Sequence, residues 1–255
     1  MLSFLPVLLI GLTLGVQAEA TAPQAPPYVG ERMRWEIRYL GVMGGWAEAW
    51  AEAGDDGQVE FHATVDNASW YERLYTIHDV VQSTWVPGSG SRRYQTVFRE
   101  GGFHQDQDMK LDPEGFSVWR HQRFDGVWRE WTRSYPAHPN AEDPVSAIQV
   151  LRLLPGGTGP WRYPVFTGEE TWTLVVSEGR PRTLSSEVLG EIAVRRLDLK
   201  TFHRGMLEQR GRFTIFVSDD DRRIPVLLLV GTNFGTIRAD LVDYQPPAGG
   251  PIAAE

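Results

Sequence analysis

The stretch GGWAEAWAEAGDDGQVEFHATV, residues 44–65, decides the fold class. Helical spacing would place Trp46 and Trp50 on one helix face. A spacing of two instead places four alanines on one face of a strand: Ala47, Ala49, Ala51 and Ala53. Glycine-rich turns border the first half, and eight residues between two turn signals form a strand more often than a helix. We therefore predict a β-hairpin made of Trp46–Ala53 and Val59–Val65.

The same alternation recurs along the chain and predicts a mainly β protein. The segment EDPVSAIQVLRLLPGG, residues 142–157, is different, because apolar residues repeat there with helical spacing. Asp143 is a natural N-cap, Pro144 suits the first helical position, and we predict one main helix over residues 143–154. The further predicted strands are residues 77–86, 94–99, 103–111, 116–124, 127–134, 169–176, 182–188, 192–201, 212–218, 224–230 and 236–244.

Two apolar features bear on a cavity. A helix that packs closely on the sheet needs small side chains beneath it, and the packing density of protein interiors favours this explanation of the alanine row. Alternatively, the alanines leave room for a ligand. Val226–Val230 is apolar on both faces, so this strand is covered either by a helix and a second sheet or by a helix and an enclosed pocket. The candidate cavity-lining residues are Ala47, Ala49, Ala51, Leu227 and Leu229.

The N-terminal segment has the outline of a secretory signal peptide. Leu2–Val16 is an uninterrupted apolar run, followed by small residues at Ala18 and Ala20. The run is short for a membrane span, and Pro6 would interrupt a membrane-spanning helix. We expect cleavage after Ala18 or Ala20. We then expect a Pro-rich linker over residues 21–29, one β-rich domain over residues 30–244 and a disordered tail over residues 245–255.

Composition narrows the functional classes. The 255 residues carry 25 Lys and Arg against 33 Asp and Glu, a net charge of −8, which argues against a general nucleic-acid binder. There is no cysteine, so the core and not disulfides must stabilise an exported domain. No segment after the first twenty residues is long and apolar enough to span a bilayer. We expect a monomer after signal cleavage.

Catalytic and metal-binding patterns are weak. The six histidines are widely spaced and form no metal-ligand motif. Asp106, Asp108 and Asp112 lack the central glycine and terminal glutamate of an EF-hand. Asp219–Asp221 lies on a predicted hairpin turn, which such residues commonly stabilise. We therefore expect no metal, no cofactor and no catalytic residue, and an enzyme is the least favoured interpretation.

Tryptophan is unusually frequent, with ten residues, and three of them alternate with arginines in SVWRHQRFDGVWREWTRSY, residues 117–135. One explanation is cross-strand packing that stabilises a hairpin. The other is an amphipathic rim at the mouth of a cleft, or a protein interface. The candidate rim residues are Trp119, Trp128, Trp131, Arg120 and Arg129.

Three segments together resemble a known bacterial family, domain of unknown function 3108. They are GERMRWEIRYLGVMGG at residues 30–45, DPVSAIQVLR at 143–152, and FVSDDDRRIPVLLLV with GTIRADL at 216–241. The resemblance covers about Gly30 to Tyr244. It implies an exported protein of Gram-negative bacteria, and a large curved antiparallel sheet wrapped around a helix. Such a half-barrel is similar to the periplasmic lipoprotein-carrier fold. The family carries no established catalytic residues, so none is transferred.

These observations favour a periplasmic protein that binds or carries a hydrophobic molecule, a lipid or an acylated compound, without catalysis. The alternative is a structural or adaptor protein of the cell envelope that works through the Trp- and Arg-rich surface.

Overall fold

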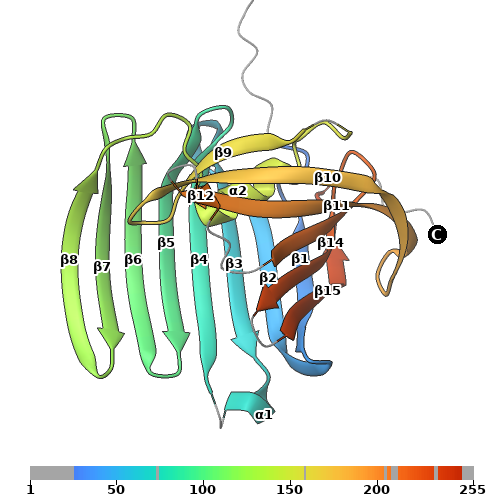
Figure 1. Cartoon of the computed structure of the whole chain (residues 1–255), viewed down its shortest axis with the longest axis horizontal. Helices are drawn as coiled ribbons and strands as arrows, with labels where there is room; N and C mark the ends of the chain where they lie inside the picture. The colour runs from blue at the N-terminus through green and yellow to red at the C-terminus, as the bar shows by residue number, and fades with distance from the viewer. Residues whose placement is uncertain are drawn as a thin grey trace, which may run out of the picture.

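One antiparallel sheet accounts for most of the computed structural model (Figure 1). The structure describes residues 26–72, 75–157, 159–203, 206–207, 212–232 and 235–248. The expected signal peptide lies outside these residues, as do most of the expected linker and tail. Among the described residues, no helix has both the length and the apolar character needed to cross a membrane.

The sheet follows the order β8-β7-β6-β5-β4-β3-β2-β1-β15-β14-β13-β11-β10-β9, and the two-residue strand β12 pairs with β11. In Figure 1 the sheet is curved, so that β10 and β11 cross in front of the eight-residue main helix. The fold class, a mainly β protein with a large curved sheet that is not closed, is confirmed. The strands are β1 Arg32–Tyr39, β2 Val42–Ala53, β3 Val59–Asn67, β4 Ile77–Val86, β5 Gly90–Glu100, β6 Phe103–Asp112, β7 Gly115–Phe124, β8 Val127–Tyr135, β9 Trp161–Phe166, β10 Thr171–Ser186, β11 Gly190–His203, β12 Met206–Leu207, β13 Arg212–Ser218, β14 Pro225–Thr232 and β15 Gly235–Gln245.

The hairpin predicted from the opening stretch is present as β2 and β3, with Ala49 opposite Ala63. Its alanine face is the concave one, because Ala47 and Ala49 pack against the cluster of Met33 and Trp35. The tryptophans lie on the convex face, where each is covered by an arginine. The guanidinium of Arg32 lies 4.6 Å from the ring centroid of Trp50, and that of Arg34 lies 5.2 Å from that of Trp46.

The helix α2, Pro144–Leu151, packs its Ala147 and Leu151 into the concave face. The Asp143 side chain caps it by accepting from the backbone N–H of Val145 and of Ser146. The helix is shorter than the expected 143–154. After Leu151 the backbone N–H groups of Arg152, Leu153 and Leu154 each donate to the carbonyl oxygen three residues earlier. These bonds form tight turns in place of further α-helix. The side chain of Arg152, the residue that follows the helix, forms an ion pair with the buried carboxylate of Glu31.

Two other elements differ from the sequence prediction. β10 is one long strand in place of two, with an irregular register between Glu178 and Pro181 where the prediction broke it. β9 was not predicted, because Pro164 argues against a strand except at a sheet edge, and β9 is an edge. Two short helical turns, η1 Asp55–Gly57 and α1 Ser69–Glu72, complete the described elements.

β14 is covered on both sides, as its apolar sequence predicts. Leu228 faces the helix side, opposite Ile215 of the helix-packed cluster. Leu227 lies on the other side, in a cluster with Phe216 and the partly buried Leu184. The far end of the long β10–β11 hairpin therefore provides the second cover.

Candidate functional site

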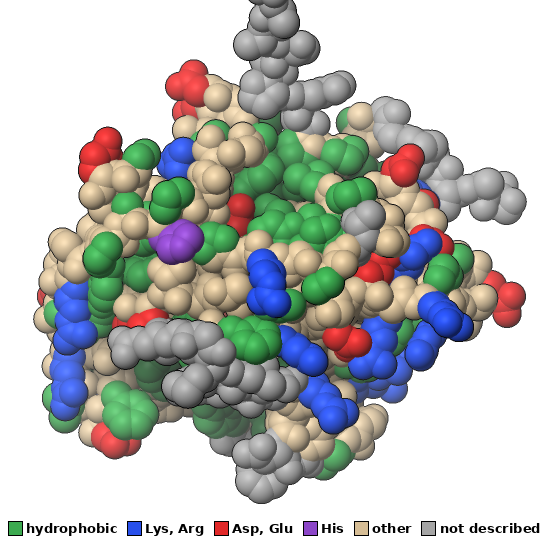
Figure 2. Space-filling view, turned by 45° about the horizontal axis from the view of Figure 1, so that its top comes forward, with side chains coloured by type: hydrophobic (Ala, Val, Ile, Leu, Met, Phe, Trp, Pro, Cys, Tyr) green, Lys and Arg blue, Asp and Glu red, His purple; other side chains and the backbone are tan. Residues whose placement is uncertain are grey.

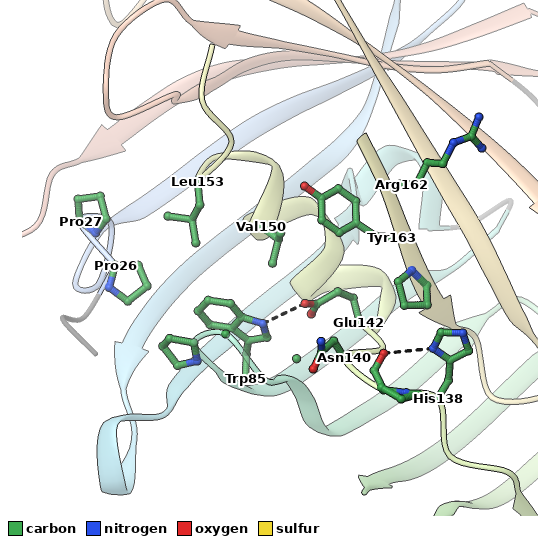
Figure 3. A pocket seen from close by; sticks show the side chains of 15 residues that line it. Pro26, Pro27, Trp85, His138, Asn140, Glu142, Val150, Leu153, Arg162 and Tyr163 are labelled. Carbon is green, nitrogen blue, oxygen red and sulfur yellow. Dashed lines mark hydrogen bonds between the residues drawn. The ribbon is translucent and has the colours of Figure 1, made fainter. Parts of the chain in front are cut away.

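A pocket of about 910 Å³ opens where the N-terminal segment, the β4–β5 turn, the chain before α2, and β9 meet (Figure 3). We call it the Trp85 pocket. It is lined by Pro26, Pro27, Trp85, Pro87, Gly88, Gly90, His138, Pro139, Asn140, Glu142, Val150, Leu153, Arg162, Tyr163 and Pro164.

The lining divides into a buried base and an exposed rim. Trp85 and Glu142 form the base, with exposed fractions of 4% and 5%. The rim carries Leu153, His138 and Arg162, all exposed. In Figure 3 the carboxylate of Glu142 points to the indole of Trp85, while the guanidinium of Arg162 points away from the base. On the upper face of the molecule, hydrophobic side chains gather around the middle (Figure 2).

Close backbone approaches bring these residues together from distant parts of the sequence. The β4–β5 turn touches the chain before α2 at Gly90. This residue has φ of +81°, and a Cβ there would lie 2.7 Å from the carbonyl oxygen of Ala141. On the other side, Glu142 bridges to Val165 of β9 through backbone bonds of 2.8 Å to Pro164 and from Phe166. The bridge brings Tyr163 to the pocket.

Glu142 at the base is adjacent in sequence to a second buried carboxyl group, that of Asp143, which does not line the pocket. Glu142 accepts from Ser146 Oγ at 2.7 Å, from Trp85 Nε1 at 3.3 Å and from Ser91 Oγ at 3.4 Å. Asp143 accepts from Ser91 Oγ at 2.8 Å and from Ser83 Oγ, besides the two helix N–H groups it caps. The pair is therefore hydrogen-bonded by neutral donors, and no ion pair reaches either acid within the described part of the chain.

Burial changes the protonation of this pair. Loss of hydration raises the pKa of Glu142 to about 7, and the charge of Asp143 adds to this, while the hydrogen bonds from Ser146, Trp85 and Ser91 oppose it. Burial likewise raises the pKa of Asp143. The pKa of Tyr163 is raised by burial and then by the charge of Glu142. Near neutral pH this buried pair thus carries less negative charge than two acids would in water, and Glu142 is the member that lines the pocket.

A second pocket, of about 540 Å³, lies beside α2 on the concave face. Its walls include Ile148 of the helix, Leu174 and Leu199 of β10 and β11, and Phe213 of β13. It is apolar, and the carboxylates of Glu169 and Glu170 lie at its border. No group of three or more His, Cys, Asp or Glu placed to hold a metal occurs among the described residues.

The structure separates the five predicted cavity-lining residues. Ala51 is buried against Phe61 and Trp85. Ala47 and Ala49 are partly buried against the neighbouring core cluster, so all three face the concave side. Leu227 and Leu229 face the opposite side of the sheet, and Leu227 lines a third pocket, of about 520 Å³, beside Arg238. A ligand contact at these residues stays a prediction.

The predicted rim residues divide between the two faces of β7 and β8. Trp131 and Arg120 are paired across the strands on the concave face, and their cation–π distance is 4.8 Å. Arg129 shares that face by alternation. Trp119 and Trp128 face the convex side, where Trp119 donates to Glu130 and Trp128 stacks on His121 at 4.5 Å.

Sequence reasoning missed Trp85, Glu142 and Tyr163. In the sequence, Asp143 indicates only a helix N-cap, and Glu142 precedes it without an assigned role. The signal available was a pair of adjacent acids before a helix with no basic residue beside them.

The fold defines a class, an open β-barrel-like protein, and comparison with solved structures agrees. A β-barrel-like protein of domain of unknown function DUF1849 from Brucella abortus is similar with a TM-score of 0.61 at 12% identity. The match covers 87% of this chain and 99% of that one. This likeness shows the fold alone.

The sequence places the chain in a particular family. The model of "Protein of unknown function (DUF3108)" matches residues 34–242, and the chain belongs to this family, as the resemblance predicted. MucB, solved in complex with MucA(peri), aligns over 88% of this chain and 96% of its own, at 13% identity. Its TM-score is only 0.17, so it carries no argument. No curated protein matches the sequence.

Proposed function

We propose that the protein is a non-catalytic periplasmic binding protein that holds a hydrophobic ligand, a lipid or an acylated molecule, in the Trp85 pocket. The observation that carries the proposal is the pocket itself. Its volume of about 910 Å³ lies within the range of roughly 300–1,000 Å³ that is usual for small-molecule sites. Apolar and aromatic side chains form most of its wall, and a few polar groups converge on it, as such sites require.

The distribution of polarity supports one orientation of the ligand. An apolar chain would lie against Trp85 and Val150 at the base, where a protonated Glu142 carries no charge. The polar end would lie at the rim, beside the exposed His138 and Arg162. This arrangement keeps charged groups in water and removes apolar surface from it, which is the dominant favourable term in binding.

The proposed compartment rests on the first twenty residues. The apolar run and the small residues at Ala18 and Ala20 support export, and the absence of cysteine is compatible with a domain stabilised by its core.

The proposal is tested by measuring how tightly a fluorescent fatty acid binds to the parent and to a variant in which the rim of the pocket is narrowed. Leu153 lines the pocket and is 41% exposed, so Leu153→Trp adds bulk at the entrance without overfilling the core. Val127 is 55% exposed and lies on β8, which contributes no residue to the pocket, so Val127→Trp is the matched control. We expect Leu153→Trp to weaken binding at least tenfold, a change of about 1.4 kcal/mol.

The control should bind as the unmodified protein does, and both variants should unfold at the same urea concentration as the parent. Equal binding by Leu153→Trp and the parent, or no binding by any of them, would contradict a hydrophobic ligand in this pocket.

A further inference from the structure

The two edges of the open sheet are built differently. At the β9 edge, Glu142 pairs in parallel with Val165 through two backbone hydrogen bonds of 2.8 Å, and Pro164 removes one backbone donor. The strand has only six residues. Short length, proline and a covering segment are the means by which proteins keep a sheet edge from pairing with another chain.

The β8 edge has none of these three features. β8, Val127–Tyr135, has nine residues and no proline, and seven of the nine are exposed. It pairs with β7 on one side, and within the described residues no strand pairs with its other side. In Figure 1 it forms the left margin of the sheet, with nothing drawn beside it. Such an edge is a template for an added strand.

The register shows which backbone groups are open. The β7–β8 turn has two residues, Asp125 and Gly126, both with positive φ, so Phe124 and Val127 close the hairpin as its first hydrogen-bonded pair. Hydrogen-bonded and non-hydrogen-bonded pairs then alternate along the ladder. The backbone N–H and C=O groups that point away from β7 are therefore those of Trp128, Glu130, Thr132 and Ser134.

Side chains along this edge add chemical selectivity. Arg129 and Arg133 lie on the concave face on either side of Trp131, and neither forms an ion pair with any described residue. Basic side chains line the corresponding margin in Figure 2. At the hairpin tip, Phe124, Val127 and Trp128 are 62%, 55% and 48% exposed. Exposed apolar groups gathered beside an open strand edge are typical of an interaction surface.

Two registers in which a second copy of this chain could pair with β8 are unfavourable. Antiparallel pairing of two β8 strands about a two-fold axis at Trp131 would place Arg129 opposite Arg133. Centring the pair one residue earlier would place Glu130 opposite Glu130. Like charges directly opposite each other destabilise a sheet.

We propose that β8 binds an extended segment of a different protein, which adds a strand to the sheet and carries acidic residues opposite Arg129 and Arg133. This surface is separate from the Trp85 pocket, and the proposal does not depend on the ligand bound there.

The test uses a blocked nine-residue peptide with two glutamates four positions apart and β-branched residues between them. Its counterpart has lysines in place of the glutamates. Binding is measured by amide hydrogen exchange and by titration. The glutamate peptide should slow exchange at Trp128, Glu130, Thr132 and Ser134, while the lysine peptide should bind at least tenfold more weakly.

Thr132→Pro removes an outward N–H without removing a bond to β7, and it should abolish peptide binding. Thr132→Val retains the N–H and the β-branched shape, so it is the matched control and should bind as the parent does. Equal binding of both peptides, equal binding by Thr132→Pro, or no protection of these amides would overturn the proposal. A dimer of the unmodified protein that Thr132→Pro dissociates would also overturn it, in favour of self-pairing.

Discussion

Replacing Glu142 by glutamine should remove a pH dependence of stability that the buried acid pair creates. Burial raises the pKa of Glu142 from 4.5 in the unfolded chain to about 7 in the folded protein. Between these values the folded protein binds a proton that the unfolded chain has released. The free energy of unfolding must therefore fall as pH rises through this window, and it must level off above about pH 7.

The size of the fall follows from the two pKa values. One pKa unit corresponds to about 1.4 kcal/mol, so the parent should lose about 3 kcal/mol between pH 4 and pH 8 relative to Glu142→Gln. The glutamine amide can accept from Trp85 and donate to a serine oxygen, so it replaces the neutral acid without leaving a buried donor alone. Asp143 titrates in both proteins, so the comparison separates the contribution of Glu142.

Urea unfolding followed by tryptophan fluorescence at pH 4, 5, 6, 7 and 8 measures this difference. Glu114→Gln, at an exposed residue in the β6–β7 turn, is the control and should follow the parent at every pH. If the parent and Glu142→Gln lose stability in parallel, Glu142 is not a buried acid with a raised pKa, and the reasoning about the base of the pocket fails.

Three further changes test the core and the pocket. Arg152→Met leaves the buried carboxylate of Glu31 without its partner, so the free energy of unfolding should fall by about 3–5 kcal/mol. Adding Glu31→Gln to this variant should restore part of the loss. Equal urea midpoints for the parent and Arg152→Met would contradict the prediction. Ala51→Phe should cost about 1–3 kcal/mol, because Ala51 is 3% exposed against Phe61 and Trp85; an unchanged midpoint would mean that space remains over the alanine row. Binding of the fluorescent fatty acid should weaken as pH rises through 7 in the parent but not in Glu142→Gln, since ionisation places a charge at the apolar base; matching pH profiles would contradict that.

Local sequence patterns predicted the strands and the helix start because each depends on neighbours in the chain. Alternation over Trp46–Ala53 required a strand, and the turn residues after Ala53 marked its end. The turn predicted at Gly44 and Gly45 was wrong, because β2 begins at Val42 and both glycines lie inside it. Asp143 followed by Pro144 predicted the helix start, since capping is a contact between adjacent residues. The helix end was less predictable, because the tertiary pairing of Arg152 with Glu31 accompanies it.

The candidate site depends on contacts that no local pattern contains. Trp85 and Glu142 are 57 residues apart in sequence and meet only because the β4–β5 turn approaches the chain before α2. Likewise, the apolar residues on both faces of β14 required a packing partner on each face. The sequence could not show that the end of the β10–β11 hairpin would be one of these partners. The tryptophan- and arginine-rich hairpin was recognised, yet its position at a sheet edge depends on the order of all the other strands.

Native mass spectrometry of the purified protein shows whether the chain holds a hydrophobic ligand in the Trp85 pocket. The unmodified protein and Leu153→Trp are purified in parallel, without detergent, from cells that produce them. We expect the unmodified protein to retain a bound hydrophobic molecule that organic solvent extracts, and Leu153→Trp to have the mass of the chain alone. A ligand-free mass for both proteins, together with failure of added fatty acids or acylated peptides to bind the unmodified one, would contradict hydrophobic-ligand binding by this protein.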